Sequence, residues 1–257
     1  MDDIDYRKSM DIKIDDLLPD ITELMKHGFN VLAYGPPGTG KTSLAHKLMK
    51  QLKKEEPLTF QCHEEASQAE LVVQYLPSPE GGVVVMEGVA VRGWASGRML
   101  VLDEINHLVT SPAMSTVYRI MDDPTVAQFV MPNGDIIRPQ PGFCVWGTMN
   151  GDPEELPEAI RDRFHLTVCM WRPTQEMVDS LPPSLRKVPN QAYADPNNAF
   201  PTFREIRNFG ECCKALGVDP SETADEKVKN VARMIWGPRW AEALHVVDST
   251  HPGRKKE

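Results

Sequence analysis

The sequence has no apolar run of the roughly 18 residues that a membrane-spanning helix needs. Its first residues, among them Asp2, Asp3 and Asp5, are acidic and lack the basic and then apolar layout of a signal peptide. Cysteine is scarce, and the five thiols are an odd number without the spacing of a disulfide framework. These absences exclude a membrane, secreted or fibrous protein, and we expect a cytoplasmic chain with reduced thiols.

Positive charge is also in short supply. Lysine and arginine number 28 against 37 acidic residues, which gives a formal charge of −9. This balance argues against a protein that coats nucleic acid by bulk charge. A hydrophobic fraction of 41% with 25% charged residues is globular composition, and 257 residues suffice for one large domain or two modest ones.

Short apolar strands alternate with helical patterns through the first two thirds of the chain. Such alternation predicts a parallel α/β sheet with both faces covered by helices. The expected strands are 31–34, 58–61, 99–102, 143–146 and 166–170, and the expected helices are 19–27, 41–54 and 111–121.

Two hairpins are expected within this part. One pairs residues 83–86 with 89–91 around Glu87-Gly88, and the other places 129–131 and 136–137 around Asn133-Gly134, a strong turn signal.

After Trp171 only helical patterns remain, at 203–216 and 222–235. We therefore expect a lead-in with a short helix over 1–28, an α/β core with hairpin insertions over 29–171, and a small all-α lid over 172–257.

Residues 35–42 carry a strong phosphate-binding signature, and Ser43 follows directly after them. The glycines of this loop let consecutive backbone N–H groups approach a phosphate, and the next helix points its positive end there. Lys41 would reach the β- and γ-phosphates, and the Thr42 hydroxyl would hold Mg²⁺. The motif, known as Walker A, is Gly35-Pro36-Pro37-Gly38-Thr39-Gly40-Lys41-Thr42.

A second signature is the apolar strand 99–102, which ends in Asp103 and Glu104. In P-loop enzymes the first acid of this Walker B pattern supports Mg²⁺. The second acid can orient and deprotonate an attacking water. The pair predicts nucleotide hydrolysis, and the absence of an Asn-Lys-x-Asp guanine-reading motif favours ATP over GTP.

Four further segments complete the pattern begun by these two signatures: Leu102-Asp103-Glu104-Ile105-Asn106, Ile136-Ile137-Arg138-Pro139-Gln140-Pro141-Gly142-Phe143, Gly147-Thr148-Met149-Asn150 and the segment from Leu156 to Phe164. With them, the sequence from about Asn30 to Phe164 resembles an AAA+ ATPase, and within that superfamily it resembles the MoxR-like group and its relatives, including the ATPase subunit of cobalt chelatase. The resemblance implies a P-loop core whose fourth strand lies between the phosphate-loop strand and the two-acid strand. It also implies a hairpin before that fourth strand and another that interrupts the second helix.

The same resemblance implies roles for further side chains. Asn150 matches the sensor-1 position, whose amide can hold the attacking water. Arg163 matches the arginine that a neighbouring subunit inserts toward the γ-phosphate, with Arg161 as the rival. Arg204 matches sensor 2, with Arg207 nearly one turn further on.

The patterns and the family resemblance leave three functions to distinguish, of which we favour the first. The first is an ATP-hydrolysing ring subunit, hexameric as is usual in the family, that remodels or assembles a partner protein; the family implies a client or adaptor with a von Willebrand A-like domain. The second is the ATPase subunit of a cobalt or magnesium chelatase. The third is a nucleic-acid motor, against which the negative charge counts. Cys62-His63 and Cys212-Cys213 lack the paired spacing of a metal site.

Overall fold

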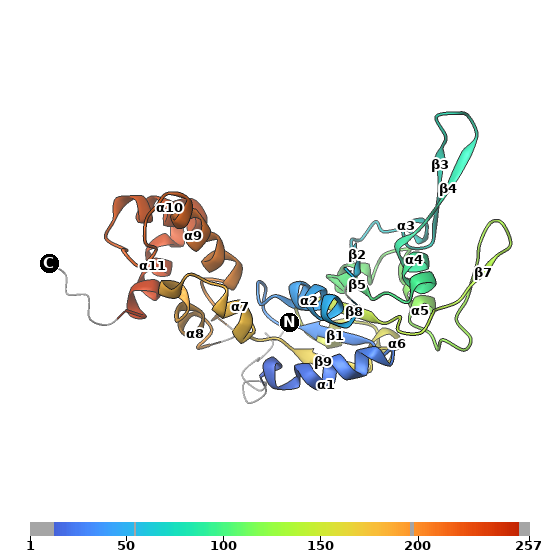
Figure 1. Ribbon diagram of the computed structural model, residues 1–257, viewed down its shortest axis with the longest axis horizontal. Helices are drawn as coiled ribbons and strands as arrows, with labels where there is room; N and C mark the ends of the chain where they lie inside the picture. Colours follow the sequence, from blue (N-terminus) through green and yellow to red (C-terminus); the bar gives the residue numbers. More distant parts are fainter. Residues whose placement is uncertain (1–12, 54, 196–197, 252–257) are drawn as a thin grey trace. The chain divides into compact units, whose positions relative to one another are not determined.

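The computed structural model describes residues 13–53, 55–195 and 198–251 of the chain, in two compact units (Figure 1). The first, here called the core unit, comprises Asp16–Tyr34 and Lys41–Cys169. The second, here called the helical unit, comprises the described residues up to Asp15, the segment Gly35–Gly40, and the chain from Met170 onward.

The core unit is built on a sheet of five parallel strands in the order β2-β5-β8-β1-β9. The strand β8 therefore lies between the phosphate-loop strand β1 and the two-acid strand β5, as the family resemblance implied. The strands are β1 (Val31–Tyr34), β2 (Leu58–Gln61), β5 (Leu100–Asp103), β8 (Val145–Met149) and β9 (Leu166–Cys169).

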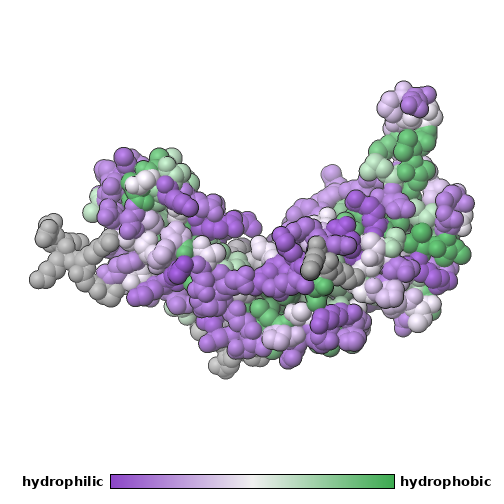
Figure 2. All heavy atoms as spheres, viewed as in Figure 1, coloured by the Kyte–Doolittle hydropathy of each residue, from purple (hydrophilic) through white to green (hydrophobic). Residues whose placement is uncertain are grey.

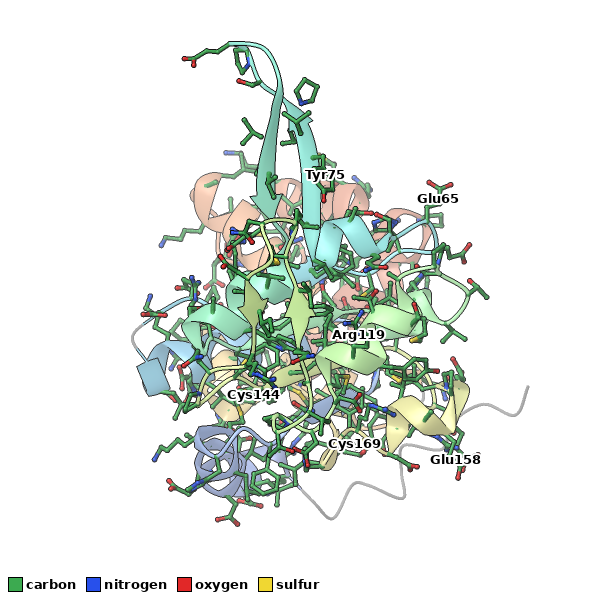
Figure 3. All side chains as sticks on the ribbon, turned by 90° about the vertical axis from the view of Figure 1, so that its right-hand side faces the viewer. Glu65, Tyr75, Arg119, Cys144, Glu158 and Cys169 are labelled. Atoms are coloured by element: carbon green, nitrogen blue, oxygen red, sulfur yellow. The ribbon has the colours of Figure 1, made fainter. Side chains whose placement is uncertain are left out.

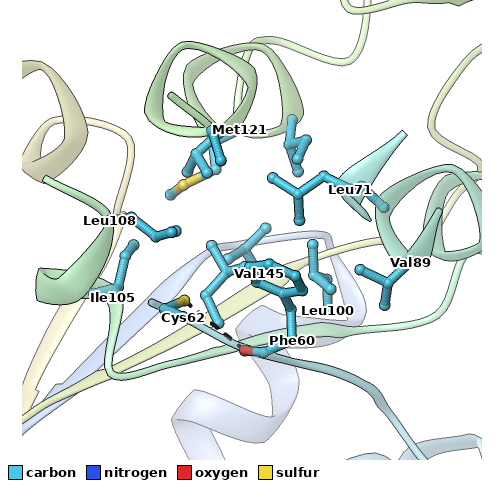
Figure 4. Packing of buried hydrophobic residues seen from close by; sticks show 14 of the residues in the cluster. Phe60, Cys62, Leu71, Val89, Leu100, Ile105, Leu108, Met121 and Val145 are labelled. Carbon is cyan, nitrogen blue, oxygen red and sulfur yellow. Dashed lines mark hydrogen bonds between the residues drawn. The ribbon is translucent and has the colours of Figure 1, made fainter. Parts of the chain in front are cut away.

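Both faces of this sheet are covered, which is why its strands are continuous apolar runs rather than alternating ones. Leu100, Val101 and Leu102 follow one another along β5, point to alternate faces, and are all fully buried. On one face Phe60, Leu100 and Val145 pack beneath helical residues (Figure 4). The sheet is thus the middle layer of a three-layer α/β core.

The helices of the core unit fill the connections between strands. The helix α1 begins at Ile14, five residues before the predicted start, and Pro19 lies inside it. The short helix α5 begins at Met114 rather than at the expected Ser111, whose hydroxyl instead donates to the Ala66 carbonyl. The bounds are α1 (Ile14–Lys26), α2 (Lys41–Lys53), α3 (Gln68–Leu71), α4 (Val89–Ser96), α5 (Met114–Ile120) and α6 (Glu158–Arg161).

The first expected hairpin was wrong in its pairing. The strand β4 (Val83–Glu87) pairs backward with β3 (Val73–Pro77), and residues 89–96 form the helix α4. The turn uses Gly81 and Gly82, whose φ values of 90° and 88° suit a left-handed turn. The hairpin lies between α3 and α4, so a hairpin does interrupt a helical segment here.

The second expected hairpin is confirmed. The strands β6 (Phe129–Val130) and β7 (Ile136–Ile137) are antiparallel, and Gly134 in their turn has a φ of 90°.

The helical unit contains both of the helices expected there, and three more. Its helices α9 and α10 begin behind the N-caps Thr202 and Asp225, whose side chains accept backbone N–H bonds. The third large helix, α11, was missed because Gly237-Pro238 separates it from α10 by only one short turn. The bounds are α7 (Gln175–Asp179), α8 (Val188–Ala192), α9 (Phe203–Ala215), α10 (Glu226–Trp236) and α11 (Trp240–Ser249).

Candidate active site

The phosphate loop, Gly35–Gly40, leads from the end of β1 to the start of α2, the strand–loop–helix context that the motif requires. Gly35 has a φ of 145°, and a Cβ there would lie 2.4 Å from the Met170 carbonyl oxygen, so only glycine fits. The Thr39 side chain is buried and donates to the Pro36 carbonyl at 3.1 Å. Ser43, by contrast, is exposed on α2.

The Thr42 hydroxyl and the Asp103 carboxylate meet at the edge where the parallel strands end. Thr42 Oγ1 donates to Asp103 Oδ1 at 2.5 Å. Both groups are hard oxygen ligands of the kind that Mg²⁺ prefers, so the pair fits a magnesium ion bound with a nucleotide phosphate.

A residue that the sequence analysis did not assign, Thr148 on β8, joins the two acids. Its buried hydroxyl donates to Asp103 Oδ1 at 2.7 Å and accepts from the Glu104 backbone N–H at 3.0 Å. The signal for it was a polar residue in an otherwise apolar buried strand, two positions before Asn150. Such a group must find partners within the protein.

Asn150 bridges the lysine of the phosphate loop and the second acid. Its Oδ1 accepts from Lys41 Nζ at 2.7 Å, and its Nδ2 donates to Glu104 Oε1 at 2.6 Å. These residues come from three separate elements, and the Asn150 and Lys41 positions are 109 residues apart in the chain. One amide thereby fixes the distance between a cation and a carboxylate.

Glu104 has an unusual backbone, with a φ of 59° and a ψ of 55° in the left-handed region. It is the one described non-glycine residue with a positive φ. A non-glycine residue in this conformation costs about 1–2 kcal/mol. The strain turns the Glu104 side chain toward Asn150 at the end of β5, which is common at functional sites.

The carboxylates also influence a neighbouring thiol. Burial, and next to it the negative charges of Asp103 and Glu104, raise the pKa of Cys62 well above its usual range. The Cys62 thiol therefore stays protonated and unreactive at neutral pH. It is one of five cysteines, none of which forms a disulfide bond within the described residues.

Arg163 lies elsewhere in the core unit. Its side chain pairs with Asp122, and it lines a cavity of about 450 Å³ whose lining includes none of Lys41, Thr42, Asp103 or Glu104. Arg161 is half-buried, and its Nε is buried without a hydrogen-bond partner.

The helical unit places Arg204 on the first turn of α9, exposed to solvent. A Cβ at Gly38 of the phosphate loop, which belongs to the same unit, would lie 3.1 Å from Thr202 Cβ and 3.6 Å from the Arg204 backbone nitrogen. Arg204 is thus close to the loop, whereas Arg207 forms an ion pair with Glu211 at 3.7 Å.

A phosphate loop, a strand ending in two acids and a strand ending in an amide together define a P-loop ATPase of the AAA+ class. The sequence model of one protein family, the AAA domain of the dynein-related subfamily, matches residues 30–164, and the chain belongs to this family. It is an AAA+ ATPase of the MoxR-like type, a class that binds ATP with Mg²⁺.

Similar proteins include midasin of Dictyostelium discoideum, 28% identical over 70% of this chain, and the denitrification regulatory protein NirQ of Stutzerimonas stutzeri, 28% identical over 59%. The chain spans 3% of that midasin and 55% of NirQ. The RuvB Holliday junction branch migration motor of Thermotoga maritima has the same fold, with a TM-score of 0.50 and 17% identity over 80% of this chain and 63% of that one. Among the described residues, no helix is long and apolar enough to cross a membrane.

Proposed function

We propose that this chain is an ATP-hydrolysing ring subunit that couples ATP turnover to the remodelling or assembly of a partner protein. The observation that carries the catalytic part is the Asn150 amide, which holds Lys41 on one side and Glu104 on the other. A phosphate-binding cation and a candidate base are thereby held at a fixed separation, as attack of water on a γ-phosphate requires.

The residues divide the reaction among themselves. Lys41 and the backbone N–H groups of the phosphate loop bind the β- and γ-phosphates, and Glu104 takes the proton of the attacking water. Thr42 and Asp103 would hold the magnesium ion, which neutralises charge on the phosphate oxygens when bound. Asn150 orients the water, and Arg204, which lies near the phosphate loop of its own unit, is proposed as a further contact to the phosphates.

The position of Arg163 supports the proposed assembly. Because this residue lines a cavity outside its own Lys41–Glu104 cluster, it completes an active site only by reaching the nucleotide of a neighbouring copy. Each copy would supply Arg163 to one neighbour and accept Arg163 from the other. Such a head-to-tail contact is heterologous and can close into a ring, and we propose a hexamer.

The client is proposed to be a protein with an apolar surface. The β3–β4 hairpin projects from the core unit (Figure 1), and it exposes large apolar side chains on both of its faces. Figure 2 shows hydrophobic residues along its strands and hydrophilic ones at its tip, and Tyr75, 60% exposed, is labelled in Figure 3. The hairpin holds no lysine or arginine from Val73 to Glu87, so it offers nothing to a phosphate backbone. An adaptor with a von Willebrand A-like domain in the cytoplasm would suit this role.

The decisive experiment on catalysis is Glu104→Gln. Glutamine keeps the oxygen that accepts from Asn150 but cannot take a proton. We therefore expect ATP to bind normally while steady-state turnover falls by at least about a hundredfold. Because the bound ATP is not hydrolysed, the variant should remain assembled as a ring, which size-exclusion chromatography would detect.

Glu65→Gln is the matched control, because Glu65 is an exposed carboxylate (Figure 3) outside the cluster. It should behave as the wild type. Unchanged turnover in Glu104→Gln would remove Glu104 as the base.

A further inference from the structure

The Arg163 guanidinium is held by three groups of its own chain. Its Nη2 donates to Asp122 Oδ1 at 2.9 Å, and its Nη1 donates to the Ala159 carbonyl at 2.6 Å. The guanidinium carbon lies 5.3 Å from the centre of the Tyr118 ring, within the range of a cation–π contact. Carboxylate, carbonyl and ring together fix the position and the plane of the group.

Arg161, two residues earlier, is different. Among the described residues its side chain makes no hydrogen bond or ion pair, whereas the Arg163 side chain makes both through Nη1 and Nη2. The Nε of each arginine is buried without a hydrogen-bond partner. The sequence favoured Arg163 over its rival Arg161, and the contacts of the Arg163 guanidinium support the same choice.

We infer that Asp122 is a positioning residue for Arg163 in the reaction of the neighbouring subunit. This rests on the proposed function, in which Arg163 acts in trans. The ion pair is partly exposed, with side chains 29% and 43% accessible, so its contribution to the stability of the fold is small. The effect of the ion pair is on geometry, because the hydrogen bond to Asp122 restricts rotation of the Arg163 side chain and so fixes the direction of its guanidinium.

Orientation matters because a group that is already aimed needs no reorganisation when charge develops in the transition state. A guanidinium has five N–H donors, and the hydrogen bonds to Ala159 and Asp122 use one N–H on Nη1 and one on Nη2. The second N–H on each nitrogen is left for a phosphate oxygen. Arg163 and Asp122 both border the cavity of about 450 Å³, so open space adjoins the pair.

The test substitutes Asp122 in the full chain and measures ATP turnover in assembled rings. We expect Asp122→Ala to lower kcat by between about tenfold and a hundredfold with little change in the KM for ATP, because the nucleotide-binding residues of the same subunit are intact. Asp122→Asn, which keeps an oxygen acceptor, should fall between Asp122→Ala and the wild type.

Asp162→Ala is the matched control. Asp162 is an exposed carboxylate next to Arg163 in sequence, and within the described part of the chain its side chain makes no hydrogen bond or ion pair. The Asp162→Ala substitution removes one negative charge, as Asp122→Ala does, but leaves the contact between Arg163 and Asp122 intact. We expect this variant to keep wild-type kcat.

Mixing subunits separates positioning from a merely structural defect. An Asp122→Ala subunit has an intact nucleotide site, and a Lys41→Ala subunit has an intact Arg163–Asp122 pair, so a mixture should recover turnover at the interfaces that combine them. The inference is overturned if Asp122→Ala keeps wild-type kcat, or if its loss is not restored by mixing although rings form. If Arg163→Ala is rescued by mixing in the same assay, the proposed function survives that outcome; if Arg163→Ala has no effect, both fail.

Discussion

At the scale of single residues, the site depends on short polar contacts that meet at one edge of the sheet. Asn150 connects Lys41 with Glu104, and Thr148 connects Asp103 with the backbone of Glu104. Lys41 and Glu104 were predicted as site residues from motifs and Asn150 from the family resemblance, whereas Thr148 was not predicted. A motif predicts which residues would contact the nucleotide, but it does not include the neighbouring residues that hold those side chains in position.

The prediction at this scale concerns Thr148→Val. Valine has the same shape but leaves Asp103 without one donor and the Glu104 N–H without its acceptor. We expect the free energy of unfolding to fall by about 1–3 kcal/mol, measured in urea, since Thr148 is buried and the groups that it contacts are partly buried. We also expect kcat for ATP to fall by about tenfold or more, because both acids lose a support.

Thr148→Ser is the control for this prediction, since it keeps the hydroxyl and should retain most of the turnover. Wild-type kcat in Thr148→Val would show that the hydroxyl does not position the acids.

At the scale of elements, the two hairpins show what a local pattern can predict. Asn133-Gly134 was interpreted correctly, because the turn residues themselves require the backbone that a tight hairpin needs. The pairing of residues 83–91 was not interpreted correctly, because a run of valines can pair equally well with the segment before it or the segment after it. Gly88 decides against a forward turn, since a Cβ there would lie 2.3 Å from the Leu71 backbone.

The β3–β4 hairpin provides the prediction for an element. Val84 and Met86 lie on one face of it and are about half exposed. The double variant Val84→Thr, Met86→Thr should leave basal ATPase activity and the thermal midpoint nearly unchanged, since exposed positions affect stability by about 0.5 kcal/mol or less. In a pull-down made with the Glu104→Gln background, we expect the client protein to be lost.

The exposed Met234 on α10 supplies the control, as Met234→Gln. Retention of the same client by the threonine variant would rule out this face of the hairpin as its contact. Enrichment of nucleic acid instead of protein would favour the motor hypothesis.

At the scale of the whole molecule, the proposed function requires more than one copy of the chain to complete an active site. Arg163→Ala should bind ATP with near wild-type affinity but lose turnover by about a thousandfold or more, the range known for trans-acting arginines. Mixing it with inactive Lys41→Ala subunits should restore part of the activity, measured as phosphate release against mixing ratio. Intact rings without such recovery would contradict a trans-acting Arg163.

The sequence by itself determined the family, the phosphate loop, the two acids and the strands that carry them. These follow from local order, because a glycine-rich loop between a strand and a helix, or an acid at a strand end, is written in consecutive residues. Only the tertiary structure decided the pairing of β3 with β4, the support that Thr148 gives to both acids, and the contact of Arg163 with Asp122, 41 residues away. The contacts of Thr148 and Arg163 join residues that are far apart in the chain and become neighbours only when the strands pair and the covering helices pack. The hairpin is local, but a run of valines does not show which neighbouring segment it pairs with.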